Sequence, residues 1–301
     1  MAISLQEAKE ALLRSGYLLE TRLEHKLLSA GYYVDANDAY PDPATGKSRE
    51  LDLFAITARR LGRDADFIFN VLLIECVNNS EPLVLITKKP LIGFLFHEDL
   101  RIAGLPVKLL GDRGRWIPIQ EALNLEKFHH YCASRIATQF CSFAKKQSQQ
   151  WMALHEGPHF DTFQKLCDAV DYRQDQHFKG WEFGSEEPVN LEFYYPVLVV
   201  QGGLLEARLR GTSVVLKPAT HLQFRRTVIR ESEPQTYQID VVTERQFSRF
   251  LSLLDREMET IVRRINARRP TIQKSVDKIA TSARRLRSPE AVRRALEWRS
   301  S

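Results

Sequence analysis

The run from Asp66 to Val77 (DFIFNVLLIECV) is the feature that most constrains what this chain can fold into. A β-strand this apolar is usually buried on both faces, which happens inside a sheet that helices cover on each side. We therefore predict an α/β fold with this run as an inner strand. The glutamate near its end, Glu75, is then a carboxylate in an apolar setting.

A second acid also lies in a predicted strand among apolar residues. Asp52 stands between two leucines in another predicted strand, Arg49 to Thr57. A buried carboxylate must be paired, protonated or bound to a cation. If the two strands are neighbours, Asp52 and Glu75 come together, and they repel each other unless a cation lies between them. A hard divalent ion such as Mg²⁺, or Mn²⁺ in its place, takes oxygen ligands of this kind.

The alternative is an ordinary structural role for both acids. Each would then pair with a basic side chain at a sheet edge, and such pairs need no metal. The nearby basic residues available for this are Lys47, Arg49 and Arg59.

Hydrophobic spacing predicts the other elements. Apolar residues recur at steps of three and four over residues 4–30, a helical pattern that Gly16 interrupts and Gly31 ends. Strands are predicted at 32–36, 49–57, 66–77 and 83–87, with a loop at 38–48. Helical spacing returns at 117–150 and 160–170, and a loop follows at 174–190. Later strands are predicted at 195–201, 204–209, 221–229 and 236–242, the first two joined as a hairpin by Gly202-Gly203, before a helix from 243 to about 268.

Three segments in order carry a further pattern. Glu20 lies on the first predicted helix, ahead of a glycine and a strand. A glycine-containing loop, Thr45-Gly-Lys-Ser, then leads into the strand with Asp52, and the apolar strand Leu72-Leu-Ile-Glu75-Cys-Val77 ends in the second acid. Over about residues 15–90 this set resembles the PD-(D/E)xK nuclease superfamily, which has the restriction-endonuclease-like fold.

This resemblance implies a Mg²⁺-dependent enzyme that hydrolyses phosphodiesters. Asp52 and Glu75 would hold the metal, and Glu20 would orient it or bind it through water. Glu24 lies one helical turn from Glu20 and could take its place. The metal would lower the pKa of a bound water, clamp the scissile phosphate and offset charge on the leaving oxygen.

The chain departs from the superfamily at Val77, where the pattern has a lysine two residues after the second acid. Valine can neither polarise a water nor stabilise an anionic transition state. Asn78 and Asn79 follow directly and could orient water by hydrogen bonds, and we take Asn78 as the catalytic candidate. Lys88 or Lys89 could instead reach in from the next strand.

These patterns divide the chain into four parts. Residues 1–110 form the nuclease-like core, and 111–190 are a mainly helical insertion. Residues 191–268 add strands and a closing helix that could extend the core, and 269–301 form a basic helical tail. The predicted fold class is α/β, a restriction-endonuclease-like mixed sheet flanked by helices.

The positive charge is concentrated at the C-terminal end. From Arg256 onward the chain has 13 Lys and Arg against 5 Asp and Glu, which amounts to +8, so the net charge of +5 leaves the preceding residues at −3. A basic arm on a nearly neutral body suits a polyanionic partner, most simply nucleic acid and DNA in particular. Paired arginines that could contact phosphates are Arg263, Arg264, Arg268, Arg269, Arg284, Arg285, Arg293 and Arg294.

Other features limit the location of the protein. No apolar run reaches the ~20 residues of a membrane helix, and the N-terminus lacks the features of a signal peptide, so we expect a cytoplasmic protein without membrane contact. The four cysteines are scattered, which favours reduced, mostly buried thiols over a zinc site or a disulfide framework.

We therefore expect an endonuclease-like protein that acts on DNA, in defence or repair. Two alternatives remain open. One is a degenerate nuclease fold that binds nucleic acid without cleaving it. The other is an interaction module whose arginine-rich tail docks an acidic partner. A homo-oligomer or a partner protein is compatible with each of these.

Overall fold

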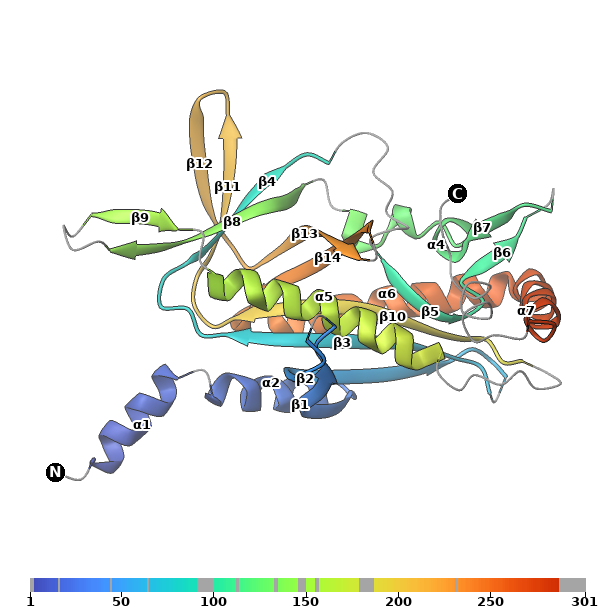
Figure 1. Cartoon of the computed structure of the whole chain (residues 1–301), viewed down its shortest axis with the longest axis horizontal. Coiled ribbons are helices and arrows are strands. Elements are labelled where there is room, and N and C mark those ends of the chain that lie inside the picture. The colour runs from blue at the N-terminus through green and yellow to red at the C-terminus, as the bar shows by residue number, and fades with distance from the viewer. Residues whose placement is uncertain are drawn as a thin grey trace.

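The computed structural model describes residues 3–286 except 16, 44, 64, 91–99, 112–113, 133–134, 146–149, 155–156, 179–186 and 231. Its main feature is one large mixed β-sheet with helices on both faces (Figure 1). The prediction of an α/β fold with a mixed sheet flanked by helices is therefore confirmed. Within the described part, no helix is both long and apolar enough to span a membrane.

The N-terminal elements follow the predicted order. Two helices, α1 (Leu5–Arg14) and α2 (Tyr17–Ser29), precede three strands, β1 (Tyr33–Pro41), β2 (Ser48–Arg60) and β3 (Phe67–Val77). Gly31, with φ of +80°, turns the chain from α2 into β1, because this left-handed conformation costs glycine little. The strands β1 and β2 extend into the predicted loop at 38–48 and leave only 42–47 between them.

The middle and C-terminal parts add more strands than predicted. The middle holds β4 (Leu83–Lys88), β5 (Arg101–Leu105), β6 (Lys108–Leu110), β7 (Trp116–Pro118), α4 (Ile119–Ala122), 3-10 turns at Leu125–Lys127 and His130–Cys132, β8 (Ile136–Lys145), β9 (Trp151–Leu154) and α5 (Gly157–Phe178). The C-terminal part holds β10 (Asn190–Val200), β11 (Leu204–Arg210), β12 (Ser213–Ala219), β13 (His221–Arg230), β14 (Glu233–Thr243), a 3-10 turn at Glu244–Gln246, α6 (Phe247–Ala267) and α7 (Arg269–Ala283).

The strand β10 returns to lie beside β3. The two strands pair in parallel over their full length, from Asn190 opposite Phe67 to Val200 opposite Val77. On its other side β3 pairs antiparallel with β2. The sheet order is β1-β2-β3-β10-β14-β13-β8-β4-β11-β12, so residues 191–268 extend the sheet of the N-terminal part rather than forming a separate one.

Both faces of β3 are buried, as its apolar sequence predicts. Leu72 and Ile74 pack into a core with side chains of α2, α6 and α7. Val71 and Leu73 pack on the opposite face, against Phe163 and other apolar residues of α5. Burial of each such side chain stabilises the fold by roughly 1.5–3 kcal/mol.

Three elements project from this body: α1 and two hairpins, β8–β9 and β11–β12 (Figure 1). In the sheet, β4 lies between β8 and β11, so the two hairpins flank it. Both hairpins expose large apolar side chains, among them Trp151, Leu209 and Leu216.

The predicted helical insertion at 117–150 is wrong for most of its length. Residues 136–145 form the strand β8, whose pairing with β4 shifts register between Ile86 and Thr87. Such a bulge interrupts the two-residue alternation of a strand. The shift puts Ala137 and Phe140, three residues apart as in a helix, into the same core although the backbone is extended.

The predicted hairpin at Gly202-Gly203 is also wrong, because β10 and β11 do not pair with each other. The two glycines serve a close approach instead. A side chain at Gly202 would lie 2.1 Å from the backbone oxygen of Asn79, in the turn between β3 and β4. The actual hairpin joins β11 to β12 and turns at Gly211, with φ of +60°.

A buried polar network lies in the core beneath α6. His130 donates from Nδ1 to Glu257 of α6 at 2.7 Å and from Nε2 to Asp240 of β14 at 3.1 Å. Asp240 is fully buried and also accepts from His221 of β13 at 2.7 Å. Burial alone would lower the pKa of His130, but Asp240 and Glu257 outweigh it and raise this pKa to about 10. His130 is therefore an imidazolium that offsets two buried carboxylates.

Replacing His130 with leucine should destabilise the protein by about 3–5 kcal/mol, because the buried carboxylates lose the cation between them. Urea unfolding followed by circular dichroism measures this change. The matched control is His25→Leu, since His25 is exposed on α2 and its loss should change stability by less than about 0.5 kcal/mol. Equal effects of the two substitutions would contradict this account of the network.

The contribution of His130 should also depend on pH. Its pKa rises from 6.5 in the unfolded chain to about 10 in the fold, so its stabilisation is complete below pH 6.5 and is lost as pH approaches 10. The charged or titratable groups around it include Asp240, Glu257, His129, His221, Tyr131 and Tyr195. The stability difference between wild type and His130→Leu should shrink over this range in urea unfolding at pH 6.5, 8 and 9.5. A difference that stays constant would show that His130 is neutral in the fold.

Candidate functional site

The two strand-borne acids lie side by side on adjacent strands. β2 and β3 pair with Leu53 opposite Ile74, and Asp52 and Glu75 are the next residues along each strand. The Oδ2 atom of Asp52 accepts a hydrogen bond of 2.6 Å from the backbone N–H of Cys76. The predicted convergence of these two side chains is therefore present in the structure.

Glu20 of α2 lies near enough to Asp52 and Lys165 for their charges to shift its pKa. Its helix is held against the sheet by Leu19, Leu23 and Leu27, which are fully buried. Arg22 further ties α2 to the turn after β14 through two hydrogen bonds to Glu244, at 2.6 and 2.9 Å. Glu20 is half-buried. Burial first, and then the negative charge of Asp52, raise the pKa of Glu20.

A lysine that the sequence analysis did not identify completes the cluster. Lys165 of α5 donates from Nζ to Oε2 of Glu75 at 2.7 Å. Its backbone carbonyl accepts a hydrogen bond of 3.0 Å from the hydroxyl of Tyr40 on β1, and the neighbouring Leu166 is buried against the sheet. These contacts fix the turn of α5 from which Lys165 extends. An ammonium group thus lies beside the second acid, although position 77 is valine.

Glu75 is the most perturbed of the three acids. Its side chain is only 5% exposed. Burial and the charge of Asp52 raise its pKa to about 7, although Lys165 acts in the opposite direction. Burial also raises the pKa of Asp52, against the hydrogen bond from Cys76. The site therefore holds negative charge that one lysine does not fully offset.

One oxygen of Glu75 has no hydrogen-bond donor. Oε2 binds Lys165, whereas Oε1 is buried and meets no donor at hydrogen-bonding geometry among the described residues, although the backbone N–H of Asp52 is near enough to lower the pKa of Glu75. A buried carboxylate oxygen without a donor is costly. With Asp52 alongside, it offers the oxygen ligands that a hard divalent cation takes, and Mg²⁺ commonly uses only one or two protein carboxylates. The residues present therefore fit such an ion.

Two of the three basic side chains suggested as structural partners of the acids, Arg49 and Arg59, form ion pairs with other acids. Arg49 forms ion pairs with Asp42 and, at 3.7 Å, with Asp168. Arg59 pairs with Asp255 of α6 at 2.5 Å. Neither arginine caps Asp52 or Glu75. Glu75 is instead paired with Lys165 of α5, whereas Asp52 accepts from the backbone N–H of Cys76.

The structure places the four residues suggested in place of the lysine, Asn78, Asn79, Lys88 and Lys89, in different surroundings. Lys88 and Lys89 were expected on a strand next to β3, but β10, β14, β13 and β8 lie between β3 and β4 in the sheet, so that expectation is wrong. Asn79 braces its own turn, donating to the carbonyls of Glu81 and Gly203 and accepting from Gly202. Asn78 is exposed one residue beyond the end of β3, and its catalytic role stays a prediction.

The arginine-rich helices contribute fewer exposed cations than their sequence indicates. Arg264 binds the carbonyls of Leu123 and Asn124, and Arg269 forms an ion pair with Asp66. These two side chains stabilise the fold. The candidates that are exposed are Arg263, Arg268, Arg284 and Arg285, whereas Arg293 and Arg294 lie outside the described residues.

A second group of potential metal ligands is His129, His130 and Glu257, whose ligand atoms all lie within 4.8 Å of one another. Its hydrogen bonds do not suit a metal. Nδ1 of His129 accepts from the backbone N–H of Tyr131 at 3.1 Å, so the proton of this imidazole is on Nε2, the atom that faces the group. Both nitrogens of His130 donate to carboxylates. A histidine ligand needs a free lone pair, so this group is a hydrogen-bonded network.

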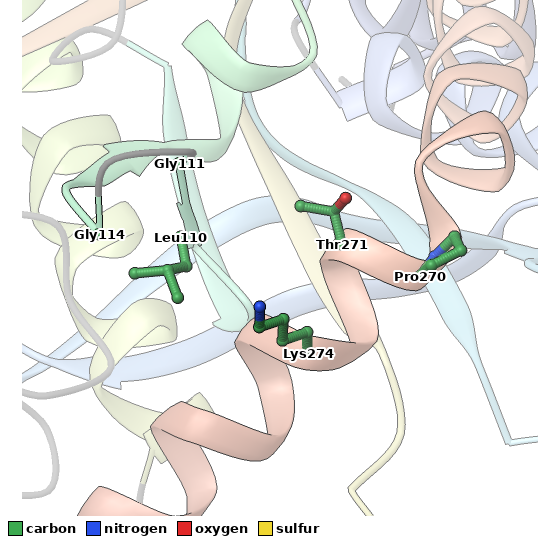
Figure 2. A pocket seen from close by; sticks show the side chains of 6 residues that line it. All are labelled: Leu110, Gly111, Gly114, Pro270, Thr271 and Lys274. Carbon is green, nitrogen blue, oxygen red and sulfur yellow. The ribbon is translucent and has the colours of Figure 1, made fainter.

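A cavity of about 540 Å³ lies elsewhere, between the β6–β7 hairpin and the first turn of α7. Leu110, Gly111 and Gly114 form one wall, and Pro270, Thr271 and Lys274 form the other (Figure 2). None of the three acids lines it. The cavity is therefore separate from the acidic site.

Comparisons with models of protein families, with curated proteins and with solved structures gave no significant match to this chain.

Proposed function

We propose that this protein is a metal-dependent nuclease whose active site consists of Asp52, Glu75, Glu20 and Lys165. The observation that carries the proposal is the setting of Glu75: a buried carboxylate with one oxygen on Lys165, the other without a donor, and Asp52 on the adjacent strand. The helix, paired acidic strands and lysine supply the groups that the PD-(D/E)xK resemblance implies, with the lysine on a different element.

The arrangement of the sheet supports the same proposal. The strand that carries Glu75 is flanked by an antiparallel neighbour and a parallel one, with α2 and α5 on opposite faces. This agrees with the mixed, helix-flanked sheet of the restriction-endonuclease-like fold. The similarity rests on strand order and on these four side chains, and it covers α2 to β3 together with α5 and β10.

Each residue then has a defined task. Asp52 and Glu75 would hold the divalent ion, and Glu20 would orient it or bind it through water. When bound, such an ion acidifies water and offsets negative charge on the phosphate and the leaving oxygen. Lys165 would donate from Nζ either to the attacking water or to a phosphate oxygen, where its positive charge stabilises the transition state. Glu75 keeps that ammonium in place before substrate arrives.

Lys165 favours catalysis over the degenerate, binding-only alternative. The ammonium of Lys165 supplies, beside the second acid, the positive charge that Val77 cannot. The substrate we propose is DNA. The exposed arginines of α6 and the C-terminal end of α7 would contribute phosphate contacts to binding.

Replacing Asp52 with asparagine or Glu75 with glutamine should lower plasmid cleavage in Mg²⁺ or Mn²⁺ by more than about 100-fold. Loss of a residue that merely orients a ligand costs 10- to 100-fold, so loss of a ligand should cost more. Glu50→Gln is the matched control, because Glu50 is exposed on the same strand two residues before Asp52. Full activity of both site variants would rule out the proposed metal site, as would undiminished cleavage by the wild type in EDTA.

Replacing Lys165 with methionine should lower kcat by about 10²- to 10³-fold, the usual cost of removing one transition-state donor. Metal affinity, measured by calorimetry, should not fall, because Lys165 competes with the ion for Glu75. Lys165→Arg should recover part of the rate. Lys47→Met serves as the control, since Lys47 is an exposed lysine before β2. A loss of metal binding equal to the loss of rate would assign Lys165 a purely structural role.

A further inference from the structure

An apolar pocket of about 190 Å³ lies beside the turn that follows β3. Its lining consists of Phe143 from β8, Trp151 from β9 and Glu81 from the β3–β4 turn. Trp151 is 51% exposed, so about half of its surface is open to a ligand. At about 190 Å³ the pocket has room for a single base-sized ring beside these two aromatic side chains.

The turn between β3 and β4 links this pocket to the acidic site. Asn79 donates to the carbonyl of Glu81 at 2.8 Å and accepts from the N–H of Gly202 at 2.9 Å, so the turn is held to the end of β10. Glu81 follows Glu75 by six residues, and a chain of this length spans at most about 20 Å. The pocket therefore lies within a few nucleotides of the acids.

Charge at the pocket suits a nucleic-acid strand. Lys145 lies directly across the hairpin from Trp151, with Nζ 5.0 Å from the centre of the indole ring. Lys145 is exposed and can contact a phosphate while the ring contacts the attached base. Glu81 offers a carboxylate that can accept from the exocyclic amine of a base, as acids do from cytosine N4.

We infer that the Phe143–Trp151 pocket binds one unstacked base of a single-stranded nucleic acid whose backbone runs to the acidic site. The inference rests on the proposed nuclease function for the identity of the occupant, and it specifies that function further. A duplex keeps its bases stacked inside, whereas a single strand can place each base on an aromatic ring. The substrate region next to the acids is therefore single-stranded.

Tryptophan fluorescence measured with a 12-nucleotide oligo(dC) tests base binding in this pocket. EDTA is present to remove metal, so the measurement does not require catalysis. The wild type should show saturable quenching, and a blunt duplex of the same length should give little. Trp151→Ala should remove the quenching and weaken oligo(dC) binding roughly 5- to 150-fold, the range for loss of one base–aromatic stack. Trp151→Phe should retain most of the affinity. Trp116→Phe is the control, because Trp116 lies on β7 beside Lys108 and Lys278, away from this hairpin.

The outcomes separate the pocket from the proposed activity. Unchanged oligo(dC) affinity in Trp151→Ala, or equal quenching by the duplex, would overturn the pocket inference even if Mg²⁺-dependent cleavage is found. Quenching that depends on Trp151, in a protein that cleaves nothing, would support the pocket and reject the nuclease. Thermal melting of each variant checks folding, and the exposure of Trp151 makes a large loss of stability unexpected.

Discussion

The acidic site depends on the position of β3 between β2 and β10. With a strand on either side and helices over both faces, water has little access to the side chain of Glu75. The same carboxylate on an edge strand would be solvated, and its charge would cost little. Desolvation makes the negative charge expensive, and a group that lowers this cost, whether a cation or a proton, binds there more strongly.

Lys165 offsets part of the negative charge of Glu75, and it does so from an element that the sequence pattern did not indicate. In the nuclease pattern on which the proposed function is based, the lysine belongs to the same strand as the second acid. Here it comes from a helix across the face of the sheet, 90 residues later in the sequence. For the proposed reaction the position of the positive charge matters, and the element of the backbone that supplies it does not. Val77, in turn, is partly buried among the apolar residues on the α5 face, where a lysine would have to be desolvated.

Local patterns were enough to predict part of this structure. Alternation and apolar content identified β2, β3 and both acids, since each of these signals lies within a dozen residues. The same reasoning failed for β8, where a bulge produces helix-like spacing. It also failed for Gly202-Gly203, because Gly202 packs closely against Asn79, in a turn more than 120 residues earlier. Lys165 could not be found for a similar reason. It is one lysine on an amphipathic helix, and only the tertiary fold shows which face of the sheet that helix covers.

The pairing of β3 with β10 also has a consequence for biosynthesis. The two strands are separated by more than 110 residues, so β3 leaves the ribosome well before its partner. At 5–20 residues per second, the interval is roughly 6–25 s. During that time the nascent chain carries an apolar strand with one edge unsatisfied, a state that invites association with other chains. The centre of the sheet therefore stays open to association with other chains until translation delivers β10.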